Sequence, residues 1–415
     1  MFLRNARLAE GHHVDIAIGA DGRITDIDPA HAAAPAGPHN LIEDLTGYLL
    51  LSSAAEPHAH LDKALTADLA PNTEGDLLGA IDAWISFAPT QSRDQIAVRA
   101  LRAAEELLAN GVTAVRTHVN VRTGQFDAIE ALLTVRDQLH GALDMQIVAL
   151  TTMQLCGGPE MYRRVLQQSV ALDSCVVIGG CPHLDDDAHQ ATDISLDVAG
   201  ETGRPLDLHT DESLNPDALH LPYLAERVIH LGYRHGATAS HCVSLGVLDP
   251  VQQRDISELV AGAGVAVVTL PQTNLFLQGR AHRQSTPRGL TALRSLLDAG
   301  VTLGAGADNV RDPFNLMGRS DPMETAALLV MAGHLSVAEA YGAVTDGARG
   351  AMGLPPVTIA VGQRADLLAI CGQSLNDAVA RADSSRIVFS AGRIVARTVV
   401  ERSTYPTSNH THRQD

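Results

Sequence analysis

Two histidines separated by one residue are the first feature of this sequence that could do chemistry. His58 and His60 stand in the segment EPHAHLDK (56–63), directly after a short apolar stretch that predicts a buried strand. Side chains two residues apart on a strand point the same way, so both imidazoles can bind one cation. The same spacing occurs at His410 and His412 near the end of the chain, so the pair alone does not establish a metal site.

Further histidines and acidic residues follow later predicted strands. His209 and Glu212 lie in DLHTDE (207–212), His241 lies in ASHC (239–242), and Asp308 lies in GADN (306–309). Two histidines, a third histidine from another strand and an aspartate form a mixed nitrogen and oxygen site, which suits Zn²⁺ or Fe²⁺ and leaves a position for water. The pattern predicts such a site if the ends of these strands meet.

The elements that position these residues repeat along the chain. Apolar segments recur at roughly 30-residue intervals, and each is followed by a helical pattern, which is typical of repeated βα units. Eight such units predict an α/β fold, a (β/α)₈ TIM barrel, with active-site residues at the carboxyl ends of the strands. A doubly wound sheet is disfavoured, because no turn with three glycines follows an early strand. The expected strands are Leu49–Ser52, Ala114–Val119, Gln146–Leu150, Val176–Gly179, Leu206–His209, Ala237–Ser240, Val265–Thr269 and Thr302–Ala305.

Short strands also begin and end the sequence. FLRNARL, HVDIAIG and GRITDID at the start, and LLAI and IVART near the end, have the composition of strands and are separated by turn residues. They predict a small flanking β-sandwich built from residues 1–50 and 355–402. The barrel is then expected over residues 51–354, and a mobile polar tail over residues 403–415.

Composition excludes several classes of protein. The formal net charge of −18 opposes binding to nucleic acid or to an anionic membrane. No apolar stretch approaches the roughly 20 residues of a membrane span. The five cysteines form no CxxC pair, which favours a reducing compartment. We therefore expect a cytoplasmic protein that acts on a small molecule.

Several longer segments carry a resemblance to a known family. The sequence from about Asp44 to Gly392 resembles the amidohydrolase superfamily, and within it the cytosine deaminase-like branch. The matching segments are EPHAHLDK (56–63), RTHVNV (116–121), DMQIVAL (144–150), CPHLD (181–185), DLHTDE (207–212), ASHC (239–242), NLFLQGR (274–280) and GADNVRDP (306–313).

The resemblance implies a role for each residue of the predicted site. His58, His60, His209 and Asp308 would bind one divalent metal ion, Zn²⁺ or Fe²⁺. Glu212 and His241 would move protons and handle the hydrolytic water, which Asp308 would help to orient. No lysine ends the fourth barrel strand, where relatives with two metals carry one, so a single metal is expected. A possible homo-oligomer is implied only by this resemblance.

The substrate-binding positions depart from the cytosine deaminase pattern. The glutamine of that pattern falls on Thr152, with Gln154 nearby, and its second aspartate is replaced by Asn309. Phe314 replaces a tryptophan. These departures argue against cytosine as the substrate, because a pocket that leaves polar groups of the ring unpaired loses affinity for it.

Four further residues are expected on the substrate side. Arg280 can bind a carbonyl oxygen or a carboxylate, or it can form a structural ion pair. His183 is expected to line the pocket, and Gln278 to lie near the substrate. Lys63, the only lysine of the chain, either contacts the substrate or holds Asp62.

Together these features predict a hydrolase that acts on non-peptide C–N bonds. A metal-bound hydroxide would attack a small nitrogen heterocycle, and Glu212 would pass a proton to the ring and then to the leaving ammonia. Loss of an alkylamine from an s-triazine-like ring and opening of a cyclic amide are the alternatives. A metal-free binding protein is the alternative from another class, and it has no use for a proton carrier beside a metal site.

Overall fold

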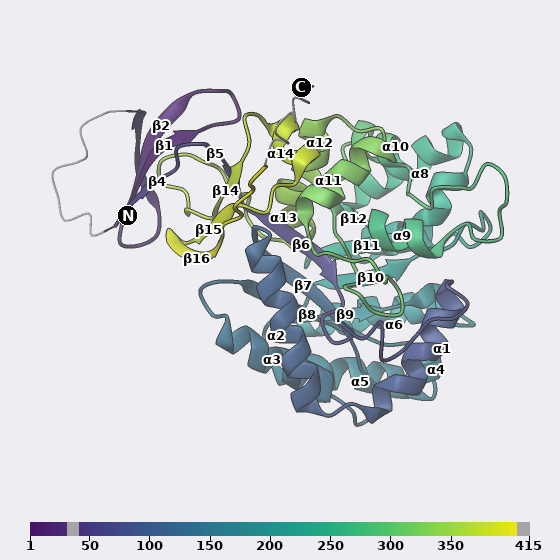
Figure 1. Ribbon diagram of the computed structural model, residues 1–415. Coiled ribbons are helices and arrows are strands. Elements are labelled where there is room, and N and C mark those ends of the chain that lie inside the picture. The colour runs from purple at the N-terminus through teal and green to yellow at the C-terminus, as the bar shows by residue number, and fades with distance from the viewer. Residues whose placement is uncertain (31–40, 405–415) are drawn as a thin grey trace, which may run out of the picture.

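The computed structural model describes residues 1–30 and 41–404, which form two sheets and the helices around one of them (Figure 1). One sheet is a parallel barrel, and the other joins strands from the two ends of the chain. His410, His412 and nearly all of the predicted tail lie outside the described residues. Among the described residues, no helix is long and apolar enough to cross a membrane.

The barrel confirms the predicted fold class. Its eight strands pair in sequence order, each parallel to the next. A parallel bridge between Ala59 and Asp308 joins the first strand to the segment after the last, so the cylinder closes at the end that carries the predicted site. The strands are β6 Ala54–Ala59, β7 Val112–Asn120, β8 Asp144–Leu150, β9 Val176–Gly180, β10 Leu206–Thr210, β11 Ala237–His241, β12 Val265–Thr269 and β13 Leu303–Ala305.

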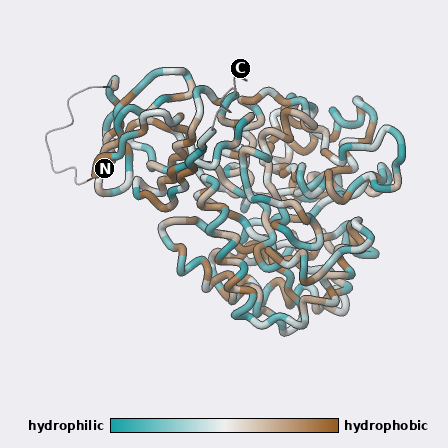
Figure 2. Tube along the Cα trace, in the orientation of Figure 1, coloured by the Kyte–Doolittle hydropathy of each residue, from teal (hydrophilic) through white to brown (hydrophobic). Residues whose placement is uncertain are grey.

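Helices surround the barrel and bury their apolar faces against it. Hydrophobic and hydrophilic residues alternate along these helices (Figure 2), as expected for elements with one face on a core. The larger helices are α1 Leu77–Phe87, α2 Arg93–Ala109, α3 Asp127–Gln138, α5 Pro159–Leu172, α6 Ala188–Thr202, α7 Leu221–Leu231, α8 Pro250–Ala263 and α11 Pro322–Met331. The shorter ones are α4 Met153–Cys156, α9 Pro271–Leu277, α10 Leu293–Asp298, α12 Val337–Gly342, α13 Ala348–Ala351, the 3₁₀ turns η1 Ala88–Thr90, η2 Pro182–Leu184 and η3 Val243–Val247, and the π turn η4 Ala343–Gly347.

The first barrel strand differs from the prediction. The apolar segment Leu49–Ser52 belongs to β5 (Tyr48–Ser52), which pairs antiparallel with β14 (Leu367–Cys371) in the other sheet. The barrel begins one segment later, at β6, which carries His58 within the strand itself. Alanine, glutamate and proline make up most of β6, and these residues have low strand propensity, so its closure of the barrel is what makes it a strand.

The second sheet combines the first and last strands of the chain, which lie side by side in Figure 1. The strand order is β16-β15-β14-β5-β1-β2-β3, with β4 beside β1. Its own apolar core contains Leu3, Ile16, Ile24, Leu367 and Phe389. The remaining elements are β1 Phe2–Arg7, β2 His13–Ile18, β3 Ile24–Pro29, β4 Ile42–Asp44, α14 Leu375–Arg381, β15 Arg386–Ser390 and β16 Arg393–Thr398.

Candidate active site

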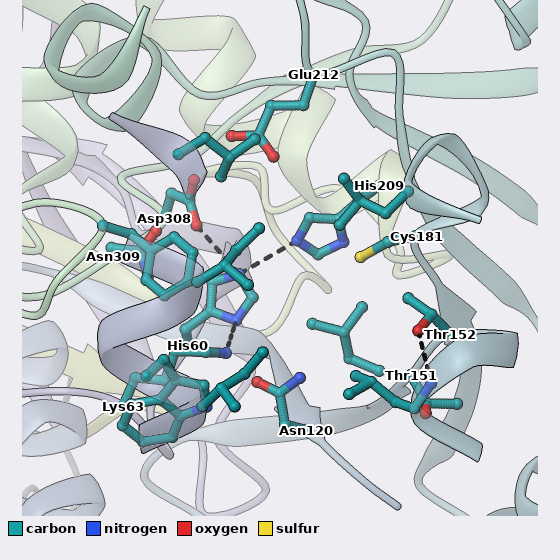
Figure 3. Close-up of a pocket in the computed structure, with 18 of the residues that line it drawn as sticks. His60, Lys63, Asn120, Thr151, Thr152, Cys181, His209, Glu212, Asp308 and Asn309 are labelled. Atoms are coloured by element: carbon teal, nitrogen blue, oxygen red, sulfur yellow. Dashed lines mark hydrogen bonds and ion pairs between the residues drawn. The ribbon is translucent and has the colours of Figure 1, made fainter. Parts of the chain in front are cut away.

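The predicted metal ligands meet at the carboxyl end of the barrel. His58 lies on β6 and His60 directly follows it, His209 lies on β10, and Asp308 follows β13. Nε2 of His209 lies 3.2 Å from Nε2 of His58 and 3.3 Å from Nε2 of His60. Oδ1 of Asp308 lies 3.3 Å from Nε2 of His60 and 3.8 Å from Nε2 of His58. The four side chains therefore converge, as Figure 3 shows for His60, His209 and Asp308.

Three residues at or just after the ends of barrel strands have a backbone conformation that is rare outside glycine. Asp211, His241 and Asp308 adopt positive φ angles of 52°, 74° and 66°, which residues other than glycine rarely adopt. Such conformations persist where the surrounding structure determines them, and they concentrate at functional sites.

The imidazoles of the cluster have the protonation state that a metal requires. Burial away from water lowers the pKa of His58, His60 and His209 well below the ordinary value. Neighbouring positive groups lower it further. The rings are therefore neutral at pH 7 and keep a nitrogen lone pair for a cation.

A network of hydrogen bonds among buried polar residues positions the His58 ring. Its Nδ1 lies 2.9 Å from Oγ of Ser240, which donates to Asp207 at 3.0 Å. Arg116 in turn donates to the other oxygen of Asp207 at 2.7 Å. Burial raises the pKa of Asp207 to about 6, against the opposing effect of Arg116. This network fixes the orientation of the His58 ring and leaves Nε2 facing the other ligands.

His60 is fixed by a backbone oxygen. Its Nδ1 lies 3.1 Å from the carbonyl oxygen of His118, which can only accept a hydrogen bond, so Nδ1 donates and Nε2 carries the lone pair. In that tautomer Lys63 cannot donate to Nδ1, although its Nζ lies only 3.0 Å away. Lys63 forms its ion pair with Asp62, at 3.6 Å.

Glu56 secures the segment that carries Asp308. Its two carboxylate oxygens accept hydrogen bonds from the backbone N–H groups of His58, at 3.2 Å, and of Ala307, at 2.9 Å. A side chain at Gly306 would collide with this carboxylate, so glycine is required there. Burial raises the pKa of Glu56 to about 8.

His118 is a buried neighbour of the cluster to which the sequence analysis gave no role. Its ring stacks on that of His58, with 3.8 Å between centroids and 27° between planes. Two sets of side chains lie close enough to share a metal ion: His58 with His118 and His209, and His58 with His241 and Asp308. The segment RTHVNV contained the signal, since a histidine in a wholly buried stretch of β7 must face either the core or the site.

Glu212 and His241 lie together beside the ligands. Oε1 of Glu212 lies 3.6 Å from Nδ1 of His241, and the same nitrogen lies 3.0 Å from Oδ1 of Asn274. Burial raises the pKa of Glu212 to about 8 and lowers that of His241 to about 3. At neutral pH the carboxyl group therefore holds a proton and the imidazole is neutral.

A pocket opens above this cluster, and four predicted substrate residues line it: Lys63, Thr152, Asn309 and Phe314. Three of them already have polar partners in the protein: Lys63 pairs with Asp62, and Thr152 and Asn309 form hydrogen bonds. Oγ1 of Thr152 accepts from the N–H of Leu155 at 3.2 Å and so caps α4, and Asn309 donates to Asp312 at 2.8 Å. The rest of the lining was not predicted from the sequence. It includes Leu77, Ile81, Trp84 and Ile85 of α1, Asn120, Arg122, Thr151, Leu155, Cys181 and Leu184.

The other four predicted substrate residues are not among those that line this pocket. His183 packs behind it, with Nδ1 3.1 Å from the carbonyl oxygen of His209. Gln278 donates to the carbonyl oxygen of Glu212 at 3.2 Å, and Arg280 lies over the ring of Phe276. Gln154 contacts Asp186 at 3.3 Å. His183 and Gln278 thus touch the backbone of site residues.

The donor set fits a divalent cation. Both carboxylate oxygens of Asp308 are buried without a hydrogen-bond partner among the described residues. Burial, together with the nearby acidic groups of Glu212 and Asp312, raises the pKa of Asp308 well above its usual range. Neutral imidazole nitrogens facing an unpartnered carboxylate are the ligands of a mixed nitrogen and oxygen metal site.

Comparisons with known proteins identify the family of the chain. The sequence matches the amidohydrolase family over residues 148–396. It is 31% identical to a pterin deaminase of Rhizobium rhizogenes over 395 residues, which are 92% of this chain and 87% of the relative.

Two groups of solved structures have the same fold. The 5-methylcytosine deaminase of Klebsiella pneumoniae bound to 5-fluorocytosine superposes with a TM-score of 0.86 at 27% identity, over 98% of this chain and all of the other. The N-isopropylammelide isopropylaminohydrolase of Burkholderia multivorans gives a TM-score of 0.81 at 29% identity, over 95% and 98% of the two chains. These findings confirm the resemblance. The chain therefore belongs to the amidohydrolase family and is a hydrolase that acts on C–N bonds.

Proposed function

We propose that this protein hydrolyses the exocyclic C–N bond of a small aminated nitrogen heterocycle and releases ammonia. The observation that carries the proposal is the position of a protonated, buried Glu212 beside a histidine and aspartate cluster in one pocket. The relatives that act as deaminases on pterin and on 5-methylcytosine support the same reaction type.

The metal ligands in this proposal are His58, His60, His209 and Asp308. They would hold one divalent ion, Zn²⁺ or Fe²⁺, since imidazole and carboxylate ligands suit both. When bound, such an ion lowers the pKa of a coordinated water toward neutrality.

Glu212 is the proton carrier in this proposal. Because its carboxyl group is protonated at neutral pH, it can donate to a ring nitrogen as the ring carbon is attacked. The carboxylate that results can take a proton from the attacking water and deliver it to the exocyclic amine. Ammonia then leaves as a neutral molecule, the hydroxyl left on the ring carbon becomes the carbonyl of the product, and its proton returns to the Glu212 carboxylate, so the proton balance closes.

His241 has the complementary property of a fixed acceptor. Its Nδ1 donates to Oδ1 of Asn274, so Nε2 carries the lone pair, and Nε2 has no partner among the described residues. Burial keeps the ring neutral. His241 can therefore accept a hydrogen bond from the attacking water and orient it.

Apolar side chains keep bulk water away from the reaction. Leu77, Ile81 and Ile85 of α1 line one side of the pocket, and Leu155 and Phe314 lie among the other lining residues. A flat, weakly polar ring is the substrate shape that such walls accept. Exclusion of water also strengthens the electrostatic interactions inside the pocket.

Cytosine is a poor substrate in this proposal. Thr152 caps α4 and Asn309 is paired with Asp312, so neither offers the amide or carboxylate pairing that the cytosine deaminase pattern supplies. Each of these two unmatched polar contacts lowers the efficiency of cytosine turnover by about 5- to 150-fold.

The test is an ammonia-release screen of metal-replete enzyme against pyrimidines, pterins, triazines and imidazolones. We expect at least one ring to release ammonia, and we expect Glu212→Gln to lower its turnover by roughly 10² or more while metal content persists. Glu105→Gln, an exposed glutamate on α2, is the matched control. Release of an alkylamine, ring opening, or full turnover by Glu212→Gln would each overturn the proposal.

A further inference from the structure

A second pocket adjoins the first one. Both are lined by Trp84 of α1, by Asn120 at the end of β7, and by Arg122 two residues further on. The second pocket continues outward past Gln91 and Gln125. These three shared residues, which we call the junction residues, therefore stand between the metal ligands and the outer pocket.

Side-chain polar groups of the junction residues lack partners among the described residues. Nε1 of Trp84 and Oδ1 of Asn120 are buried without a hydrogen bond, although the whole Trp84 side chain is nearly enclosed, at 6% exposure. The guanidinium of Arg122 forms no hydrogen bond or ion pair with any described residue. An indole N–H left buried and unpaired is costly, so a group that accepts hydrogen bonds is expected to complete it.

Other cations near the pocket are already engaged. Lys63, the only other cation that lines the inner pocket, pairs with Asp62. Arg99 donates to the carbonyl oxygens of Asp62 and Ala64. Arg122 is thus the lining cation that remains free for a ligand.

We propose that the junction residues bind a carboxylate substituent carried by the heterocyclic substrate. The proposal rests on the proposed function and names its substrate class: an aminated ring with an acidic substituent. The guanidinium can bind both carboxylate oxygens at once, and the indole N–H of Trp84 and Nδ2 of Asn120 can donate further hydrogen bonds. Oδ1 of Asn120 can only accept, so its partner is an N–H group of the ring and not the carboxylate.

The surrounding charge favours a carboxylate over a phosphate. Asp62 and Asp127 both line the outer pocket, and the chain carries a formal charge of −18. A single guanidinium can balance one negative charge there, whereas a dianion would keep an unbalanced charge close to two carboxylates. Figure 3 places Asn120 on the side of the pocket opposite Glu212, so an acidic substituent at this end leaves the other end of the ring near the proton carrier.

The experiment uses the single tryptophan of the chain as its reporter. Because Trp84 is the only tryptophan, its fluorescence reports occupancy of the junction directly. The probes are cytosine with a carboxylate, a carboxamide or a methyl group at position 5, and pterin with the same three groups at position 6. Binding is titrated by fluorescence and turnover by ammonia release, on metal-replete enzyme.

We expect the carboxylate of at least one ring to bind roughly 10- to 150-fold more tightly than its carboxamide, the range for charge-assisted hydrogen bonds. In Arg122→Gln the ratio of the two affinities, carboxylate to carboxamide, should fall to near one. Arg234→Gln removes an exposed arginine at the opposite end of the barrel and should keep the full preference.

The two proposals fail in different ways. Ammonia release without a carboxylate preference would overturn the junction assignment and leave the deaminase proposal standing. A carboxylate preference in fluorescence that depends on Arg122, without ammonia from any ring, would support the junction and overturn the deaminase. A preference that persists in Arg122→Gln would overturn the junction assignment in either case.

Discussion

The inner cluster of the pocket and its outer junction residues differ in how the protein holds their polar groups. Behind the inner cluster, Ser240 binds His58, a backbone carbonyl binds His60, and Asn274 binds His241. Among the junction residues, Trp84 and Arg122 have side-chain donors without any such partner in the described part of the chain. The inner geometry is therefore set before a substrate arrives, whereas the junction is completed by the substrate itself.

Removal of a metal ligand is expected to have the largest effect on the activity of the inner cluster. We expect His209→Ala to lose its bound metal and to fall to the activity of metal-stripped protein, because the remaining ligands cannot hold the ion at working concentrations. His230→Ala, an exposed histidine on α7, should lose neither. Full metal occupancy of His209→Ala in elemental analysis would remove this residue from the site.

The protonation state of Glu212 is expected to have the next largest effect on turnover. Its pKa is raised in the folded protein to about 8, so the acid form is present below that pH and is lost as the pH rises through it. We expect turnover to decline on the alkaline side, at or below pH of about 8, since a nearby cation favours the ionised form. A pH profile of Glu212→Gln should lack this decline. A decline that persists in that variant would belong to another group.

The hydrogen-bonded residues that orient His58 should contribute less to metal affinity than the ligands themselves. Ser240→Ala removes the hydroxyl between His58 and Asp207 and leaves Asp207 paired with Arg116. We expect metal affinity to fall by roughly 10- to 100-fold, with activity largely recovered at high metal concentration. An unchanged metal affinity would show that the ring is oriented by other contacts.

Specificity at Thr152 and Asn309 is expected to give the smallest change. The double substitution Thr152→Gln with Asn309→Asp should improve cytosine turnover relative to the best substrate by at least roughly 5-fold. The measurement is kcat/KM for both rings in both proteins. Native enzyme that already deaminates cytosine near its best rate would contradict the specificity argument.

Much of this arrangement could be predicted from the sequence. The repeated βα period predicted the barrel, and the histidine and acidic residues after separate strands predicted which side chains would meet. The prediction of Leu49–Ser52 as the first barrel strand was wrong because its apolar composition is that of a buried strand. The true first strand, β6, is rich in alanine and proline and forms a strand only because it pairs with its neighbours in the barrel. The exact limits of the barrel and the flanking sheet stay a prediction.

The junction residues could not be predicted in this way. Trp84 lies on a helix that begins about 20 residues after His60, and its position over the pocket depends on packing that no local pattern specifies. Asn120 and Arg122 lie in and beside a matched segment without being ligands. Conversely, Gln278 and His183 lie in matched segments, but they contact backbone oxygens of Glu212 and His209 and do not line the pocket.

The most direct test of the account is a metal titration of metal-stripped enzyme. Zn²⁺ or Fe²⁺ is added back in known amounts, and bound metal and ammonia release are measured on the same samples with the best ring from the screen. The account predicts that activity rises in proportion to bound metal and saturates at one ion per chain. Full activity without metal, or saturation only at two ions per chain, would contradict it.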